Sequence, residues 1–109
     1  MTAQIVSAEV LQCGPLTMDV RRWEVSCAGR PVALTRTEFA LLRLLMRDPG
    51  CVLRRGEIYR RVWGHDVGAS SNALGIYVGY LRRKLEAGGC PRMIETVRGV
   101  GYALRPPRR

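Results

Sequence analysis

Between residues 8 and 34, apolar and polar positions alternate in short runs. Such alternation is typical of strands with one buried and one exposed face. The runs are "VLQC", "LTMDV", "RWEVSC" and "VAL", with turn signals at Gly14-Pro15 and "AGRP". This segment predicts a small antiparallel sheet of four strands. In "RWEVSC" the apolar residues expected to share the buried face are Trp23, Val25 and Cys27.

From residue 35 the hydrophobic spacing becomes helical. In "TRTEFALLRLLMRDPG", Thr35 and Glu38 have the spacing of a capping box, in which each side chain accepts a hydrogen bond from the other residue's backbone N–H. Arg43 and Arg47 point away from the apolar stripe, and the Pro-Gly pair at 49–50 ends the helix. The stripe consists of Phe39, Leu41, Leu42, Leu45 and Met46.

A second helix is predicted in "RRGEIYRRVWG", after a very short strand "CVL". Ile58 and Val62 stand four residues apart on one face, and Gly64 is suited to cap the C-terminus. Arg54 stands at the expected start of this helix. Residues 64–71 are rich in glycine and small polar residues, and therefore predict a loop.

"SNALGIYVGYLRRKLEAGG" predicts a third helix. Ser70 or Ser71 can cap its start, and the glycine pair at 88–89 ends it. Its apolar residues recur at spacings of four, three and four, which defines one buried face. That face consists of Leu74, Val78, Leu81 and Leu85.

The last structured segment, "ETVRGVGYAL", predicts a glycine-containing β-hairpin with Arg98 near its tip. A basic tail, "RPPRR", follows. The order of sheet, three helices and hairpin indicates an α+β fold, and 109 residues suit one domain, residues 1–109. We expect residues 1–7 and 106–109 to be flexible.

The charge points to an anionic partner. The net charge is +9, and 17 of the 18 basic residues are arginine, since Lys84 is the only lysine. A small domain this basic favours nucleic acid as the partner, and the alternative is a basic surface that is only solvated.

The remaining chemistry excludes several classes of function. The four cysteines show no CxxC spacing and His65 is the only histidine, so the sequence predicts neither a metal site nor a disulfide framework. One histidine and nine scattered acids provide no catalytic set, so we expect no enzyme activity and no cofactor. No apolar run approaches the roughly 18 residues of a membrane span, and no secretory signal is visible, so we expect a cytoplasmic protein without membrane contact.

The outer face of the third helix is unusual for a solvated surface. It carries two glycines, two tyrosines and the basic run "RRK", and each glycine costs about 1 kcal/mol of helix stability relative to alanine. That cost is explained if bare backbone approaches another surface closely, as in the major groove of DNA, where the basic run would meet phosphates. The alternative is that the glycines accommodate a protein neighbour. The residues on this face or its flanks are Asn72, Gly75, Ile76, Tyr77, Gly79, Tyr80, Arg82, Arg83 and Lys84.

With the third helix in the major groove, the hairpin would lie near the adjacent minor groove. That groove attracts inserted arginine, particularly where A·T-rich sequence narrows it. A two-stranded ribbon tipped by Arg98 suits this position, and Gly99 and Gly101 allow a tight turn with thin flanks. The alternative is an ordinary hairpin whose arginine points to water.

Four segments in this order resemble a known family: "LTRTEFALLRLL", "VLRRGEIYRRVWG", "SSNALGIYVGYLRRKLE" and "ETVRGVGYAL". The chain resembles the C-terminal DNA-binding (effector) domain of OmpR/PhoB-type response regulators over roughly residues 8–105, and its third helix resembles those of actinobacterial members. The resemblance implies a winged helix-turn-helix with an N-terminal four-stranded antiparallel sheet, three helices and a C-terminal β-hairpin wing.

The resemblance also implies a set of DNA-contacting residues. Trp63 would pack near the DNA backbone, Thr96 would contact a phosphate, and Arg98 would enter the minor groove. Family members often have charged residues in place of Gly75 and Gly79, so a known recognition sequence does not transfer. The expected DNA-binding residues are Trp63, Ser71, Asn72, Ala73, Ile76, Tyr77, Tyr80, Arg82, Arg83, Thr96, Arg98 and Gly99.

The implied partners are those of a two-component transcriptional regulator. They are double-stranded promoter DNA with tandem half-sites, bound by a monomer that can dimerise on DNA, and RNA polymerase through loop 64–71. A sensor histidine kinase would act only through a receiver domain of about 120 residues, which the chain has no room for and without which it should not accept a phosphoryl group. The alternative function is a protein-interaction module that contacts RNA polymerase, a receiver or another partner domain.

Overall fold

The first sheet has the four antiparallel strands that the alternating pattern predicts. The structure is a computed structural model that describes residues 10–64 and 72–107. The strands follow one another in chain order, β1-β2-β3-β4, and each pairs with the next. Their bounds are β1 Val10–Cys13, β2 Leu16–Asp19, β3 Glu24–Cys27 and β4 Arg30–Val32.

The fourth strand begins two residues earlier than expected. The turn between β3 and β4 contains only Ala28 and Gly29, and both have positive φ angles, 51° and 83°. Such two-residue turns match the twist of the flanking strands and are favoured in hairpins. Pro31 therefore lies inside β4, where it is tolerated because β4 is at the edge of the sheet.

Trp23 does not share the buried face of β3, as the alternation predicted. It lies in the turn before β3, with a φ of 57°, and its side chain is 55% exposed, whereas Val25 and Cys27 are buried. The left-handed backbone at Trp23 interrupts the strand, so the period of two does not extend to this residue. Its indole stacks on Phe39, with ring centroids 4.5 Å apart.

The three predicted helices are present. The capping box at the start of the first is confirmed, because Glu38 N donates to Thr35 Oγ1 at 3.2 Å and Thr35 N donates to Glu38 Oε1 at 2.9 Å. Gly64 caps the second helix in the left-handed conformation, as expected. The helices are α2 Arg36–Arg47, α3 Arg55–Trp63 and α4 Ala73–Ala87.

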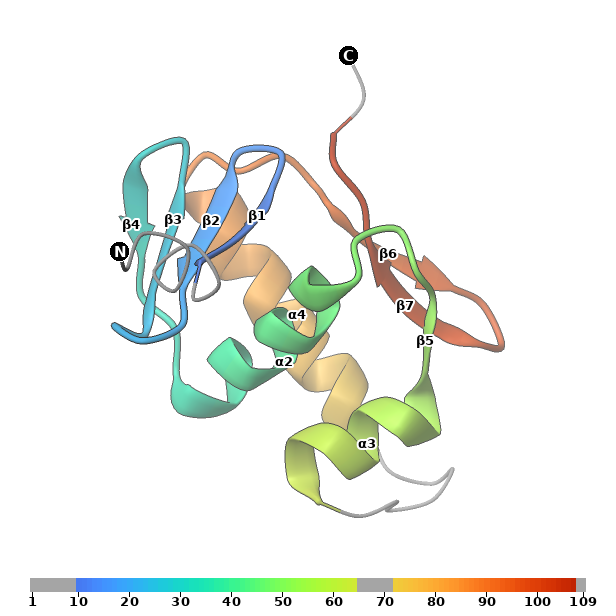
Figure 1. Ribbon diagram of the computed structural model, residues 1–109. Coiled ribbons are helices and arrows are strands. Elements are labelled where there is room, and N and C mark those ends of the chain that lie inside the picture. The colour runs from blue at the N-terminus through green and yellow to red at the C-terminus, as the bar shows by residue number, and fades with distance from the viewer. Residues whose placement is uncertain (1–9, 65–71, 108–109) are drawn as a thin grey trace, which may run out of the picture.

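Helix α2 contributes much of the core. The whole predicted stripe from Phe39 to Met46 is buried, and Arg43 and Arg47 are exposed, as expected. Figure 1 shows α2 and α4 between the first sheet and the C-terminal hairpin, with α3 below them. The predicted buried face of α4 is confirmed at all four positions: Leu74, Val78, Leu81 and Leu85.

The hairpin is part of a second, three-stranded sheet. Strands β6 (Ile94–Val97) and β7 (Gly101–Leu104) pair as predicted, and β5 (Leu53–Arg54) adds to the other edge of β7. A Cβ at Gly101 would clash with the backbone carbonyl of Leu53. Gly101 is therefore needed for the approach of β5, a requirement that the sequence did not indicate.

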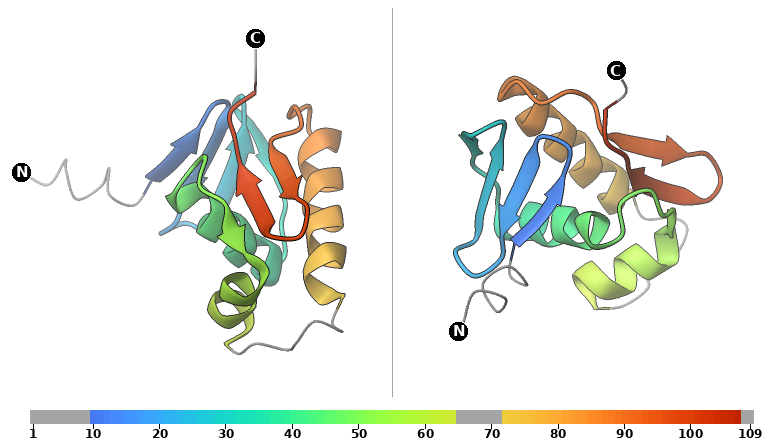
Figure 2. Two further views of the ribbon diagram at one scale, coloured as in Figure 1. Left: turned by 90° about the vertical axis from the view of Figure 1, so that its right-hand side faces the viewer. Right: turned by 45° about the horizontal axis from the view of Figure 1, so that its top comes forward.

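The hairpin lies beside α4. The left view of Figure 2 shows β6 and β7 next to this helix, and Figure 1 shows the hairpin turn extending away from the body of the molecule. The predicted winged-helix order of four-stranded sheet, three helices and hairpin is confirmed.

Candidate nucleic-acid interface

Helix α4 has an outer face that the described residues leave exposed. Asn72, Gly75, Ile76, Tyr80 and Arg83 are exposed along it. Their successive spacings are three, one, four and three residues, so they form one band along the helix, opposite the buried leucines. Four members of the band, Asn72, Ile76, Tyr80 and Arg83, belong to the expected DNA-binding set.

The two glycines of this face have no structural requirement inside the described protein. A Cβ at Gly79 would meet nothing within 4 Å, and one at Gly75 would meet only the Tyr102 hydroxyl oxygen at 3.8 Å. Neither glycine has a positive φ. Among residues 10–64 and 72–107, no neighbour requires that positions 75 and 79 lack a side chain. This disfavours the alternative that the glycines accommodate a neighbour within this protein.

The three bases of the basic run of α4 have different surroundings in the structure. Arg82 donates from Nε and Nη2 to the carbonyl oxygen of Ile94, at 3.1 and 2.8 Å, and from Nη2 to Thr96 Oγ1 at 2.9 Å. Lys84 Nζ pairs with Glu38 Oε1 at 2.6 Å. Arg82 and Lys84 therefore each have a partner within the protein, and Arg83 is the most exposed of the three. That the three bases meet phosphates stays a prediction. The partners of Arg82 and Lys84 are distant from them in the sequence.

Arg82 joins α4 to the wing. Its planar guanidinium donates both to the backbone of β6 and to the hydroxyl of Thr96. Because the guanidinium is rigid, these bonds favour a fixed angle between α4 and the hairpin. Thr96 accepts this bond, so its own proton stays available to donate to an anion such as a phosphate oxygen.

A chain of aromatic rings crosses from α3 to the outer face of α4. The successive centroid distances are 5.3 Å for Tyr59–Trp63, 5.6 Å for Trp63–Tyr77 and 5.7 Å for Tyr77–Tyr80. Arg83 lies over the last ring, with Cζ 5.4 Å from the Tyr80 centroid. Trp63 is thus held within this chain and is half-buried. The chain fixes the orientation of Tyr80 and Arg83 before any ligand binds.

The start of α4 is stabilised by a residue that sequence analysis did not identify. The N-cap is Asn72, and its side chain makes no capping bond. Instead the Tyr59 hydroxyl, on α3, accepts a hydrogen bond from Leu74 N at 3.0 Å. Ser70 and Ser71, the expected caps, lie outside the described residues, as does most of loop 64–71.

The wing turn presents Arg98 to solvent. Gly99 has a φ of 75°, and Val100 N donates to Val97 O at 2.9 Å to close the turn. Arg98 and Gly99 are both exposed, as the sequence predicted for a wing tip.

A basic groove lies between the wing turn and the start of α3. It has a volume of about 450 Å³, and Arg55 N donates to Val100 O at 3.1 Å beside it. Sequence analysis did not identify this groove, because its two sides are more than 35 residues apart; the only signal was the pair "RR" at 54–55. Its basic lining residues are Arg54, Arg55 and Arg60.

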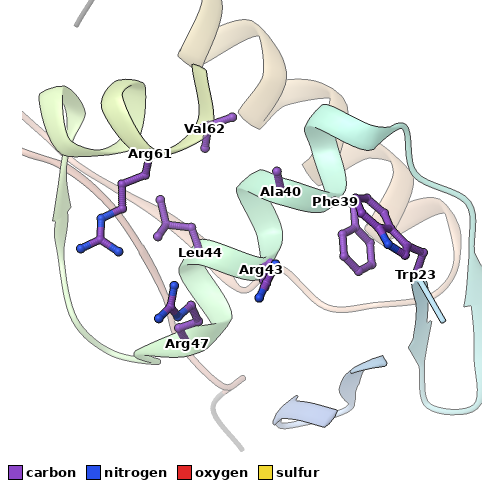
Figure 3. A pocket seen from close by; sticks show the side chains of 8 residues that line it. All are labelled: Trp23, Phe39, Ala40, Arg43, Leu44, Arg47, Arg61 and Val62. Atoms are coloured by element: carbon purple, nitrogen blue, oxygen red, sulfur yellow. The ribbon is translucent and has the colours of Figure 1, made fainter. Parts of the chain in front are cut away.

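A second groove lies on the outer side of α2, and none of the expected DNA-binding residues lines it. Figure 3 shows the stacked rings of Trp23 and Phe39 at one end and three arginines toward the other. Its volume is about 460 Å³. The lining arginines are Arg43, Arg47 and Arg61.

The described residues offer little other chemistry. Among them, no group of three or more His, Cys, Asp and Glu residues could hold a metal ion. Burial, with the neighbouring Cys27, raises the pKa of the Cys90 thiol to about 12, so this thiol is protonated at neutral pH. Across the part of the chain that is described, no helix is both long and apolar enough for a membrane span.

Comparisons with known proteins agree with this geometry. The family model "Transcriptional regulatory protein, C terminal" matches residues 29–104. The response regulator MprA of Mycobacterium sp. (strain KMS) is 56% identical over 94 residues, which cover 84% of this chain and 41% of that protein. The chain therefore spans less than half the length of the curated relatives it matches.

Two solved structures have the same fold. The DNA-binding domain of CpxR from E. coli superposes with a TM-score of 0.79 at 32% identity, covering 89% of this chain and 96% of that chain. The RstA DNA-binding domain of Klebsiella pneumoniae, in complex with the RstA box, has a TM-score of 0.82 at 27% identity, covering 91% and 99%.

Proposed function

The chain belongs to the family of transcriptional regulatory protein C-terminal domains, the effector domains of OmpR/PhoB-type response regulators, and from this premise we propose that it binds double-stranded promoter DNA sequence-specifically. In this proposal α4 enters the major groove and Arg98 enters the adjacent minor groove. The protein acts as the effector domain of a two-component transcriptional regulator.

The observation that carries the proposal is the joining of α4 to the wing by Arg82. The outer face of α4 is exposed to solvent, and Arg98 is exposed at the tip of the neighbouring hairpin. A helix and a ribbon held at a fixed angle match two successive grooves of a duplex. The solved complex of the similar RstA DNA-binding domain with the RstA box supports DNA binding by this fold.

Several basic and polar groups around α4 and the wing are suited to phosphate contacts. Arg83 is exposed beside Tyr80, Thr96 has a proton to donate, and the groove at the start of α3 is lined by three arginines. Phosphate contacts of this kind set the position of a protein on DNA, while base contacts from α4 give specificity.

We propose the remaining partners from the family. Two copies bind tandem half-sites, RNA polymerase is contacted through loop 64–71, and a sensor histidine kinase acts through a receiver domain. The site of action is the cytoplasm, and no catalytic activity is expected.

The groove around Trp23 favours a second candidate function, the docking of a partner protein. Tryptophan and arginine are the residues most enriched at the energetic centres of protein interfaces. In that case Trp23→Ala would weaken binding of the partner and leave DNA affinity unchanged.

The test begins with selection of bound sites from random duplexes. The dissociation constant for a selected site is then measured at about 50 and about 200 mM salt. Specific binding should weaken steeply with salt, because each neutralised phosphate releases counterions. Affinity that does not depend on salt, or selection without a preferred sequence, would contradict the proposal.

Arg98→Ala tests the minor-groove contact. We expect a loss of about 1–3 kcal/mol on sites with an A·T-rich minor groove and a smaller loss on others. Arg43→Ala is the matched control, since it removes the same charge from the outer side of α2. An equal loss on all sequences would mean that Arg98 contacts only phosphate.

A further inference from the structure

Ile76 is the most exposed large hydrophobic residue of α4. It is 50% exposed, and Tyr80, four residues later, is 42% exposed. Residues four apart on a helix are neighbours, so Ile76 and Tyr80 form one apolar ridge on the face that would enter the major groove. Ile76 is not part of the hydrophobic core, so the fold alone does not account for it.

This ridge is held in place before binding. Isoleucine is branched at Cβ and therefore has one strongly preferred rotamer in a helix. Tyr80 is fixed between the Tyr77 ring, 5.7 Å away, and Arg83, whose Cζ is 5.4 Å from its centroid. A rigid apolar surface loses little conformational entropy when it meets a partner.

Beside the ridge, the surface of α4 lacks side chains at two positions. Gly75 precedes Ile76 and Gly79 follows it by one turn, and no described neighbour lies within ordinary contact of a Cβ at Gly79. The missing side chains let Ile76, a short residue, come close to the edges of the base pairs. Longer side chains at positions 75 and 79 would hold the helix away.

Only one group in the major groove of unmodified DNA suits an isoleucine. The 5-methyl group of thymine is apolar, and the other base edges present hydrogen-bond donors and acceptors. Isoleucine can satisfy none of those polar groups, so a cytosine or adenine amino group buried against it would lose its hydrogen bonds to water.

We propose that Ile76 recognises the 5-methyl group of thymine and so determines part of the sequence preference of this protein. The proposal rests on the proposed binding of α4 in the major groove. It names the base that this position of the helix selects.

The experiment removes single methyl groups from the DNA. A selected site is synthesised with each thymine replaced in turn by deoxyuridine, which lacks only the 5-methyl group. At one position, or two adjacent ones, affinity should fall about fourfold, the loss expected for one buried methyl group. Other replacements should have no effect.

The same series is measured with Ile76→Ala. This variant should fold, because Ile76 is half exposed and alanine is a better helix former. It should bind the thymine site more weakly and no longer distinguish thymine from deoxyuridine at the sensitive position. Val10→Ala is the control, since Val10 is 37% exposed in the first sheet and should keep the full methyl dependence.

The outcomes separate the two proposals. Sequence-specific binding that no deoxyuridine replacement weakens would overturn the role of Ile76 and leave the proposed function intact. A methyl dependence that persists in Ile76→Ala, or a selected site without thymine, would do the same. Failure to select any preferred sequence would overturn both proposals.

Discussion

At the scale of single residues, three glycines near the proposed interface have three different physical causes. Gly101 is needed because a Cβ would clash with the Leu53 carbonyl, and Gly99 because its φ is 75°. Gly79 has open space around it and lies in the middle of α4, where glycine is unfavourable. For Gly79, no described neighbour gives an explanation, and close approach to bound DNA, as proposed, would give one.

Gly79→Ala should make the protein more stable and weaken its binding to DNA. The added methyl group raises helix propensity by up to about 1 kcal/mol, and no atom of residues 10–64 and 72–107 lies within 4 Å of it. In the major groove it would hold the helix away from the bases. Thermal unfolding and duplex titration check the two effects, and an unchanged affinity would show that close approach at this point is unnecessary.

Tyr59→Phe should destabilise the fold by about 1–2 kcal/mol, because the buried N–H of Leu74 then loses its acceptor at the start of α4. Tyr80→Phe is the control, since Tyr80 is exposed and the change should stay within about 0.5 kcal/mol. Urea unfolding measures both. Equal stability of the two variants would show that Tyr59 has no capping role.

At the scale of elements, the proposed interface is one unit because a side chain of α4, Arg82, is hydrogen-bonded to the wing. Arg82 makes three hydrogen bonds to β6 residues. The backbone bond from Arg55 to Val100 connects the wing turn to α3 as well. Helix α4 and Arg98 are therefore expected to move together, which preorganises contacts to two grooves of the DNA.

Arg82→Lys tests this connection without a change in charge. Lysine lacks the planar fork, so we expect a loss of about 1–2 kcal/mol in the free energy of unfolding and faster hydrogen exchange in β6. Arg83→Lys should change stability by less than about 0.5 kcal/mol, because Arg83 is exposed. If the two variants unfold alike, Arg82 does not hold the wing.

At the scale of the whole molecule, the ion pair between Glu38 and Lys84 connects α2 to α4. Glu38 is 2% exposed, and it also closes the capping box of α2. Burial acts to raise the pKa of this carboxyl, but the hydrogen bond from Lys84, the N–H of Thr35 and the Lys84 charge outweigh it, so the pKa is lowered overall. The ionised form is thus favoured in the folded state.

A lowered pKa makes this contribution to stability pH-dependent. It is fully present above the unfolded-state pKa of about 4.3 and is lost as the pH falls toward the lower folded-state value. Glu38→Gln keeps the shape and the capping box. We expect it to be less stable than the natural chain at pH 7 and to approach the natural chain's stability in acid, as measured by urea unfolding across this range.

Glu95→Gln is the matched control for this prediction. Glu95 pairs with Arg105, and both side chains are more than 40% exposed, so the pair should contribute less than about 1 kcal/mol at any pH. If Glu38→Gln and Glu95→Gln behave alike, burial does not determine the strength of the Glu38 pair.

The sequence by itself determined the elements of this protein and their order. The capping box at Thr35, the buried leucines of α4 and the glycine cap at Gly64 were all predicted correctly. Each depends on residues within a few positions of one another, where helix and turn geometry alone decide which groups meet. The exposed wing tip at Arg98 was predictable for the same reason.

The tertiary structure alone decided how several side chains are used. Lys84 pairs with a residue 46 positions away, Tyr59 caps a helix 15 positions later, and Arg82 reaches residues 12 and 14 positions further along. No local pattern encodes such partners, because chain folding brings them together only after the helices pack. Three adjacent bases, "RRK", therefore look equivalent in the sequence, yet in the folded protein one holds the wing, one is exposed and one pairs with a buried acid.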